Sequence, residues 1–134
     1  MATYREFEAY VKSNYPVLKN PKNSPKGFMC VEVPCPNERS HLIFVHPGAN
    51  MGKIGEFAEV VAFFGQLSEA KLEKALEETF HLPLGGLVNI HGRTALRHSI
   101  PLLNIDESEI ATAILCTAMS ADQLEAKFFG SDKF

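Results

Sequence analysis

The sequence predicts an α+β fold in which an antiparallel sheet of five strands is combined with three helices. Two observations support this class. The spacing of apolar residues changes from a helical period of about 3.6 to a strand period of 2, and this change recurs further along the chain. The strand-like segments also form blocks between helices, joined by short connections, and do not alternate with helices one by one. The expected order is helix, three strands, helix, two strands, helix.

The first helix is expected over residues 3–15. Thr3 and Glu6 have the spacing of a capping box, in which each side chain binds a backbone N–H at the helix start. Pro16 should end the helix, because proline disfavours helical geometry in the residue before it. Further prolines and two asparagines then predict a loop over residues 16–26. The helix carries apolar residues at helical spacing, namely Tyr4, Phe7, Tyr10 and Val11.

Three strands are expected next, over residues 28–33, 41–46 and 56–64. Pro34 should close the first strand, because proline has no N–H to donate to a sheet. The third segment is apolar on both faces and could begin a helix. Its short length, its valines and phenylalanines and its flanking glycines favour a strand. Alternation places Met29 and Val31 on one face of the first strand, and Leu42 and Phe44 on one face of the second.

Two more helices are expected in the second half of the chain. Ser68 should cap a helix over residues 68–80, and Asp106 with Glu109 has capping-box spacing at the start of a helix over residues 106–129. The shorter helix has a narrow apolar stripe formed by Leu72, Ala75, Leu76 and Phe80. The longer helix has a continuous apolar face formed by Ile110, Ala113, Ile114, Thr117, Ala121, Leu124 and Phe128.

A hairpin is expected between these two helices, from residues 87–90 and 94–100. A two-residue loop at residues 91–92 has the chemistry of a type I′ turn. A three-residue loop is the alternative, and a slip of one residue between the two would move every side chain to the opposite face. We favour the three-residue loop, because one face of the hairpin then carries Val88, Ile90, Thr94 and Leu96.

The composition predicts a single globular domain over residues 1–134, with 46% apolar and 22% charged residues. The net charge is −3, whereas a nucleic-acid surface normally shows a basic excess, so nucleic acid is not an expected partner. No apolar segment approaches the roughly 18 residues of a membrane span. The chain start also lacks the features of a signal peptide. We therefore expect a cytoplasmic protein that binds no membrane, with its three cysteines reduced.

Two motifs suggest chemistry but match it poorly. Residues 48–53 resemble a phosphate-binding loop, yet three residues rather than four separate the glycines, and Ile54 follows the lysine. A strand connection is expected there instead. The cysteines and histidines near the first two strands are zinc-ligand types, but their spacing differs from known zinc motifs. The sequence predicts no catalytic residue, no cofactor and no metal, with a site formed by Cys30, Cys35, His41 and His46 as the alternative.

The stretch from Val60 to Asp122 resembles the small acidic chaperones of type III secretion and the related YbjN-like proteins. The shared pattern is a strand ending in a small-residue turn, a helix, a hairpin whose second strand contains LRHSIPL, an ID cap and a last helix. This stretch covers about half of the chain, and the preceding elements fit by order alone. The chain departs from the family at residues 80–83, where the family usually has asparagine, and its charge is milder.

This resemblance implies a cytoplasmic homodimer without enzymatic activity that holds an extended segment of another protein. The expected dimer interface combines the helix over 68–80 with the hairpin, through Leu72, Leu76, Phe80, Val88, Ile90 and Leu96. The expected partner-binding residues are Met29, Val31, Leu42, Phe44, Arg93 and Arg97. The alternatives are a metalloprotein or enzyme that uses the cysteine and histidine set, and an adaptor or immunity-type protein that binds a folded partner.

Overall fold

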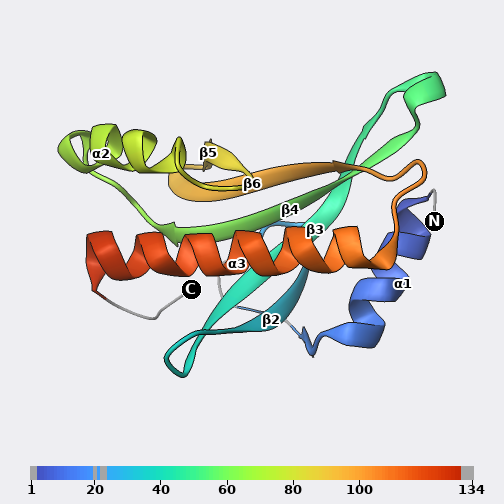
Figure 1. Ribbon diagram of the computed structural model, residues 1–134, viewed down its shortest axis with the longest axis horizontal. Coiled ribbons are helices and arrows are strands. Elements are labelled where there is room, and N and C mark those ends of the chain that lie inside the picture. Colours follow the sequence, from blue (N-terminus) through green and yellow to red (C-terminus); the bar gives the residue numbers. More distant parts are fainter. Residues whose placement is uncertain (1–2, 20, 22–23, 131–134) are drawn as a thin grey trace.

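The computed structural model describes residues 3–19, 21 and 24–130, and it confirms the α+β class. Within these residues the chain forms three α-helices and one antiparallel sheet with the strand order β1-β2-β3-β4-β6-β5 (Figure 1). The helices are α1 (Tyr4–Asn14), α2 (Glu69–Thr79) and α3 (Glu107–Phe129). The strands are β1 (Val17–Leu18), β2 (Met29–Cys35), β3 (Arg39–Asn50), β4 (Glu56–Gly65), β5 (Gly86–Ile90) and β6 (Arg93–Pro101).

The helix starts agree with the capping signals in the sequence. The Thr3 hydroxyl accepts the N–H of Glu6 at 3.2 Å, and the Asp106 carboxylate accepts the N–H of Glu109 at 2.8 Å. The Ser68 hydroxyl accepts the N–H of Lys71 at 3.4 Å. Each bond satisfies a backbone donor that has no partner inside its helix. The predicted helices over 3–15, 68–80 and 106–129 are therefore confirmed to within one residue at each end.

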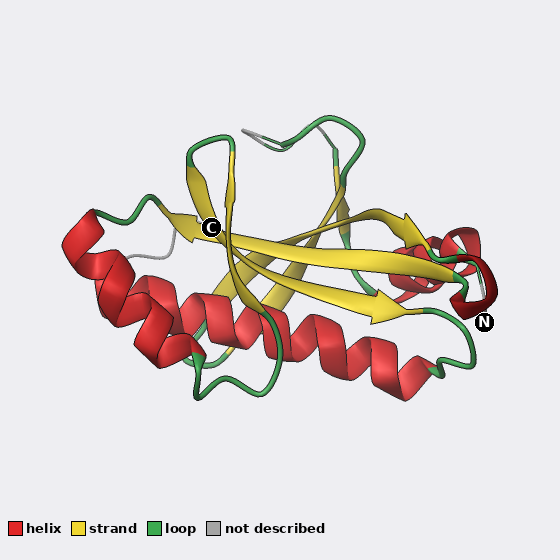
Figure 2. Ribbon diagram, turned by 90° about the horizontal axis from the view of Figure 1, so that it is seen from above, coloured by secondary structure: helices red, strands yellow, loops and turns green. Residues whose placement is uncertain are grey.

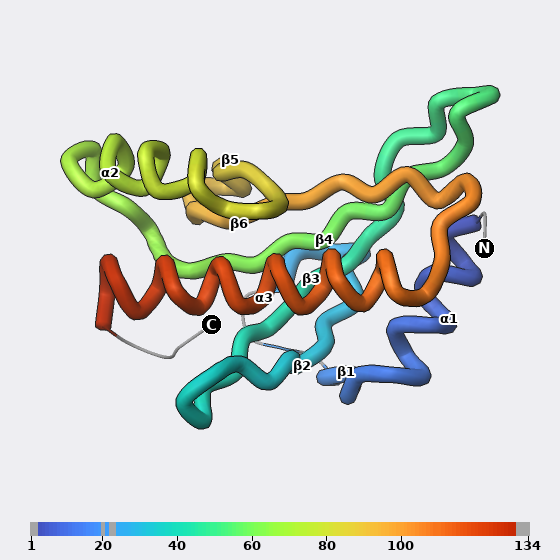
Figure 3. Tube along the Cα trace, in the orientation of Figure 1, coloured from blue at the N-terminus to red at the C-terminus, as the bar shows by residue number. Residues whose placement is uncertain are grey.

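The core lies between α3 and one face of the sheet, as Figure 2 shows for the long helix and the strands beside it. The predicted apolar face of α3 is buried at Ile110, Ala113, Ile114, Thr117, Ala121 and Leu124. The two shorter helices lie near opposite ends of α3 (Figure 3). The opposite face of the sheet carries a smaller buried cluster of Cys30, Phe44, Val61, Phe63 and Ala95. We refer to these two sides as the helix face and the open face.

The structure has one more strand than the sequence predicts, and β2 and β3 are both longer than expected, β3 running from Arg39 to Asn50. Strand β1 contributes two residues from the predicted loop, too few for an alternating pattern to reveal. Strand β2 continues through Pro34 to Cys35. Proline is tolerated there because β1 pairs β2 at Cys30 and Val31, so Pro34 lies on a stretch of β2 with no second neighbour in the described sheet.

The hairpin register differs from the one we favoured. Ile90 pairs with Arg93, so the loop has two residues, and its φ values of 50° at His91 and 82° at Gly92 are those of a type I′ turn. The prediction of a three-residue loop is therefore wrong. The type I′ turn matches the twist of the flanking strands, and this local geometry prevails over the cleaner apolar face. As a result, Leu96 lies on the helix face, whereas Val88 and Ile90 lie on the open face.

The adjacent residues Ile114 and Leu115 test this arrangement of α3. Ile114→Ala should lower the free energy of unfolding by about 2–5 kcal/mol, because it leaves a cavity beneath the helix. Leu115→Ala is the matched control, since Leu115 is 39% exposed, and its loss should be below about 1 kcal/mol. Urea unfolding followed by circular dichroism measures both values. Equal losses would contradict the orientation of α3.

Candidate functional site

The predicted partner-binding residues on β2 and β3 do not form one surface. Val31 is fully buried on the helix face, and Met29 packs against the same core. Phe44 is buried in the cluster on the open face, and Leu42 packs against that cluster. The structure therefore contradicts Val31 and Phe44 as surface contacts. Both faces of these strands are covered, so their apolar character reflects packing rather than an exposed binding patch.

The two predicted partner-binding arginines are both engaged within the chain. The Arg93 guanidinium lies 3.8 Å from the centre of the Phe63 ring and covers part of the open face. Arg97 donates two hydrogen bonds to the Glu59 carboxylate, at 2.9 and 2.7 Å. The Ser99 hydroxyl donates to the same carboxylate at 2.9 Å. Arg97 therefore forms an ion pair within the chain, and its hydrogen bonds to Glu59 raise the pKa of Arg97.

The predicted dimer residues on α2 are exposed, in contrast to those on β2 and β3. Leu72, Leu76 and Phe80 are 39%, 55% and 86% exposed, and Ala75 alone among the α2 residues is buried. Leu96, however, is fully buried beneath the sheet and is excluded from any interface. The apolar stripe of α2 therefore faces outward.

A groove of about 320 Å³ runs between α2 and the neighbouring hairpin. The edge strand β5 borders it, and within the described sheet β5 pairs with β6 alone. Its lining is mostly apolar and includes Leu67, Leu72, Leu76, Leu87 and Val88. We call this groove, together with Leu76 and Phe80, the α2–β5 surface. It combines an exposed apolar helix with a sheet edge, the two features that commonly accept another polypeptide.

Helix α2 is attached to the end of α3 through polar contacts. Lys71 Nζ donates to the carbonyl of Phe128 at 2.9 Å, and Lys127 forms an ion pair with Glu78. Gly65, just before α2, has a φ of +131°, and a Cβ there would lie 2.5 Å from the Phe129 ring. The chain thus turns away from the sheet at a position where a side chain does not fit. These contacts hold α2 in place while its apolar stripe stays exposed.

The cysteine and histidine set does not form a zinc site. Cys30 and His46 lie on the open face, where the His46 ring stacks beside Phe28, whereas His41 lies on the helix face. The alternative site built from Cys30, Cys35, His41 and His46 is therefore wrong as a set, because alternation along β2 and β3 sends its members to opposite faces. Burial also raises the pKa of the Cys30 thiol to about 11. This disfavours the thiolate, which is the form of cysteine that binds metals.

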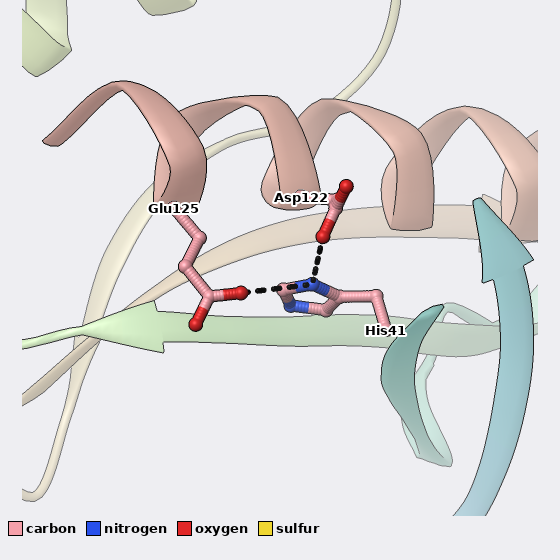
Figure 4. A group of neighbouring side chains, drawn as sticks. All are labelled: His41, Asp122 and Glu125. Carbon is pink, nitrogen blue, oxygen red and sulfur yellow. Dashed lines mark ion pairs between the residues drawn. The ribbon is translucent and has the colours of Figure 1, made fainter. Parts of the chain in front are cut away.

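His41 instead belongs to a buried charged cluster that the sequence did not reveal (Figure 4). Its Nδ1 faces Asp122 Oδ1 at 3.7 Å and Glu125 Oε1 at 3.9 Å, and all three side chains are almost fully buried. Arg39 Nε donates to Asp122 Oδ2 at 2.8 Å. These are the described residues whose imidazole and carboxylate groups come close enough to share a metal ion. The signal missed in the sequence was two carboxylates three residues apart beside the apolar face of a helix.

No known family model matches this chain, and no curated protein matches it significantly. In the described part of the chain, no helix combines the length and the apolar character needed to cross a membrane. Two features of the molecule bear on its function: the exposed α2–β5 surface and the buried charged cluster.

Removing Arg97 tests whether it stabilises the fold through Glu59. Arg97→Ala should lower the free energy of unfolding by about 1–3 kcal/mol, because the buried Glu59 carboxylate loses its charged donors. Adding Glu59→Gln should recover part of this loss, since a neutral amide needs no counter-charge. Urea unfolding of both variants gives the comparison. A double variant that is no more stable than Arg97→Ala would contradict this role.

Proposed function

We propose that this protein is a non-enzymatic protein-binding module that acts as a homodimer, with the α2–β5 surface as the contact between the two copies. The observation that carries the proposal is the exposed apolar stripe of Leu72, Leu76 and Phe80 beside an edge strand. Soluble proteins rarely leave contiguous apolar side chains exposed unless another molecule covers them. Apart from the additional two-residue strand β1, the order of helices and strands is the one expected from the resemblance to the secretion-chaperone-like fold.

The charges on α2 favour a second copy as the occupant. Lys74 is the middle residue of α2, Glu77 lies about one turn nearer the C-terminal end, and both side chains are exposed. If the two-fold axis is perpendicular to α2, the two copies of the helix run antiparallel, and Lys74 of one copy then approaches Glu77 of the other. The same axis pairs the apolar stripe with itself, as an isologous interface requires. A stable dimer of this kind buries more than about 1,000 Å² in total.

The role in binding another protein follows from the sheet edges. The β2 and β3 faces are buried, so an extended segment is better accommodated by backbone pairing at an exposed strand edge than by the apolar sheet faces. This replaces the sheet-face contact expected from the sequence. An adaptor that binds a folded partner through the α2–β5 surface is the competing function, and it predicts a monomer in the absence of that partner.

Leu76→Asp tests the dimer. A charge at this position would be buried between two copies, so dissociation should become easier by at least roughly 30-fold, the effect of a hot-spot residue. Light scattering coupled to size-exclusion chromatography measures the mass at tens of micromolar. The far-ultraviolet circular dichroism should be unchanged, because Leu76 is 55% exposed in the single chain.

Leu103→Asp is the matched control, since Leu103 is 50% exposed and belongs to the connection between β6 and α3. This connection lies at the opposite end of the molecule from α2 (Figure 1). This variant should remain a dimer. If the unmodified protein is monomeric at tens of micromolar, or if both variants dissociate equally, the α2–β5 surface is not the dimer contact.

A further inference from the structure

We propose that His41, Asp122 and Glu125 form a binding site for one divalent transition-metal cation, such as Zn²⁺, Mn²⁺ or Co²⁺, between β3 and the last turns of α3. This site lies on the helix face, apart from the α2–β5 surface, and it is independent of the proposed dimer. It also differs from the cysteine and histidine set considered from the sequence, with which it shares only His41.

The orientation of His41 leaves one ring nitrogen for a cation. Its Nε2 lies 2.6 Å from the Phe63 carbonyl, which can only accept, so Nε2 carries the hydrogen. In a neutral ring, Nδ1 then carries a lone pair, and this atom is buried without a hydrogen-bond partner among the described residues. Metal-binding histidines commonly donate their other N–H to a carbonyl in this way.

The ligand atoms converge on one point. Nδ1 of His41 lies 3.7 Å from Asp122 Oδ1 and 3.9 Å from Glu125 Oε1, and all three atoms lie within 4.8 Å of one another. Ligands of a tetrahedral zinc ion at about 2.1 Å are roughly 3.4 Å apart, so each of the two carboxylate oxygens needs to approach His41 Nδ1 by only a few tenths of an ångström. Asp122 and Glu125 project from adjacent turns of α3 toward the His41 ring (Figure 4). One imidazole and two carboxylates suit zinc and manganese.

Three acceptor groups face one another at the centre of the cluster. Arg39 contacts the two carboxylates from one side, at 2.8 Å to Asp122 Oδ2 and 3.6 Å to Glu125 Oε1. In the neutral ring, the lone pair on His41 Nδ1 is directed at oxygens of the same carboxylates. A divalent cation neutralises both carboxylates and accepts the lone pair. Arg39 is partly exposed, so it competes with the cation and turns toward solvent when the cation binds.

The cation would connect segments that are far apart in the sequence. His41 lies on β3 and the two carboxylates lie near the end of α3, so the ion joins the sheet to the last turns of the helix. Because the site exists only in the folded chain, binding should stabilise the protein in proportion to the free metal concentration.

The experiment uses the full chain, treated with a chelator and then titrated with Zn²⁺, Mn²⁺ or Co²⁺. At least one ion should bind with a stoichiometry of one and raise the midpoint of thermal unfolding. Visible absorption of the Co²⁺ form should show oxygen and nitrogen ligation without a thiolate charge-transfer band. This spectrum needs no variant, so it remains informative even if changes in the cluster prevent folding. A thiolate band, or failure of all three ions to bind the folded protein, would overturn the proposal and leave a proton as the neutralising cation.

Three variants locate the site. Asp122→Asn should weaken metal binding by more than about 100-fold. Loss of a residue that only supports a ligand typically weakens binding by about 10- to 100-fold, so a larger effect identifies Asp122 as a ligand. Arg39→Gln should bind the ion more tightly than the unmodified protein, because the competing cation is removed. This outcome distinguishes metal binding from a purely structural ion pair. His46→Gln is the matched control on the open face and should bind normally. Unchanged binding in Asp122→Asn, or weaker binding in Arg39→Gln, would contradict the assignment.

Discussion

The packing of α3 against one face of the sheet is the constraint on which the other features depend. This helix has 23 residues and provides most of the helical side of the core. One helical layer covers only one face of a sheet, so the open face must be closed by other groups. Arg93 over Phe63 and the partly buried Phe28 provide part of that cover. The apolar residues of β2 and β3 consequently pack into the buried clusters on the two faces of the sheet.

The position of α2 follows from the same constraint. Because α3 already occupies the helix face, α2 contacts the molecule mainly near the hairpin and the end of α3, and it buries Ala75 alone. A helix of 11 residues with one buried side chain gains little from packing within the chain. Its ion pair and its bond to Phe128 are partly or largely exposed and contribute modestly. An additional contact that covers Leu76 and Phe80 would therefore stabilise the helix as well as the complex.

Features that depend on nearby residues could be predicted from the sequence, whereas those that depend on distant ones could not. The caps at Thr3 and Asp106 involve residues three positions apart, so the sequence places the helix starts well. The hairpin register was predicted wrongly because we gave more weight to the alternation of apolar residues than to the type I′ turn that His91 and Gly92 can form. The charged cluster was missed because Asp122 depends on Arg39, 83 residues away. A carboxylate on a helix is ordinarily interpreted as solvent-exposed, and only the tertiary structure reveals its burial.

The last turns of α3 connect the buried cluster with the α2–β5 surface. Asp122 and Glu125 face the sheet, while Lys127 and the Phe128 carbonyl, within the next turn, hold α2. Burying two carboxylates beside His41 has a cost that apolar side chains at these positions would avoid. A helix end held by packing alone would need no such charges. Ionic contacts therefore act together with the buried Ala121 and Leu124 in holding the segment that supports α2, and ionic contacts can respond to a bound cation in a way that an apolar core cannot.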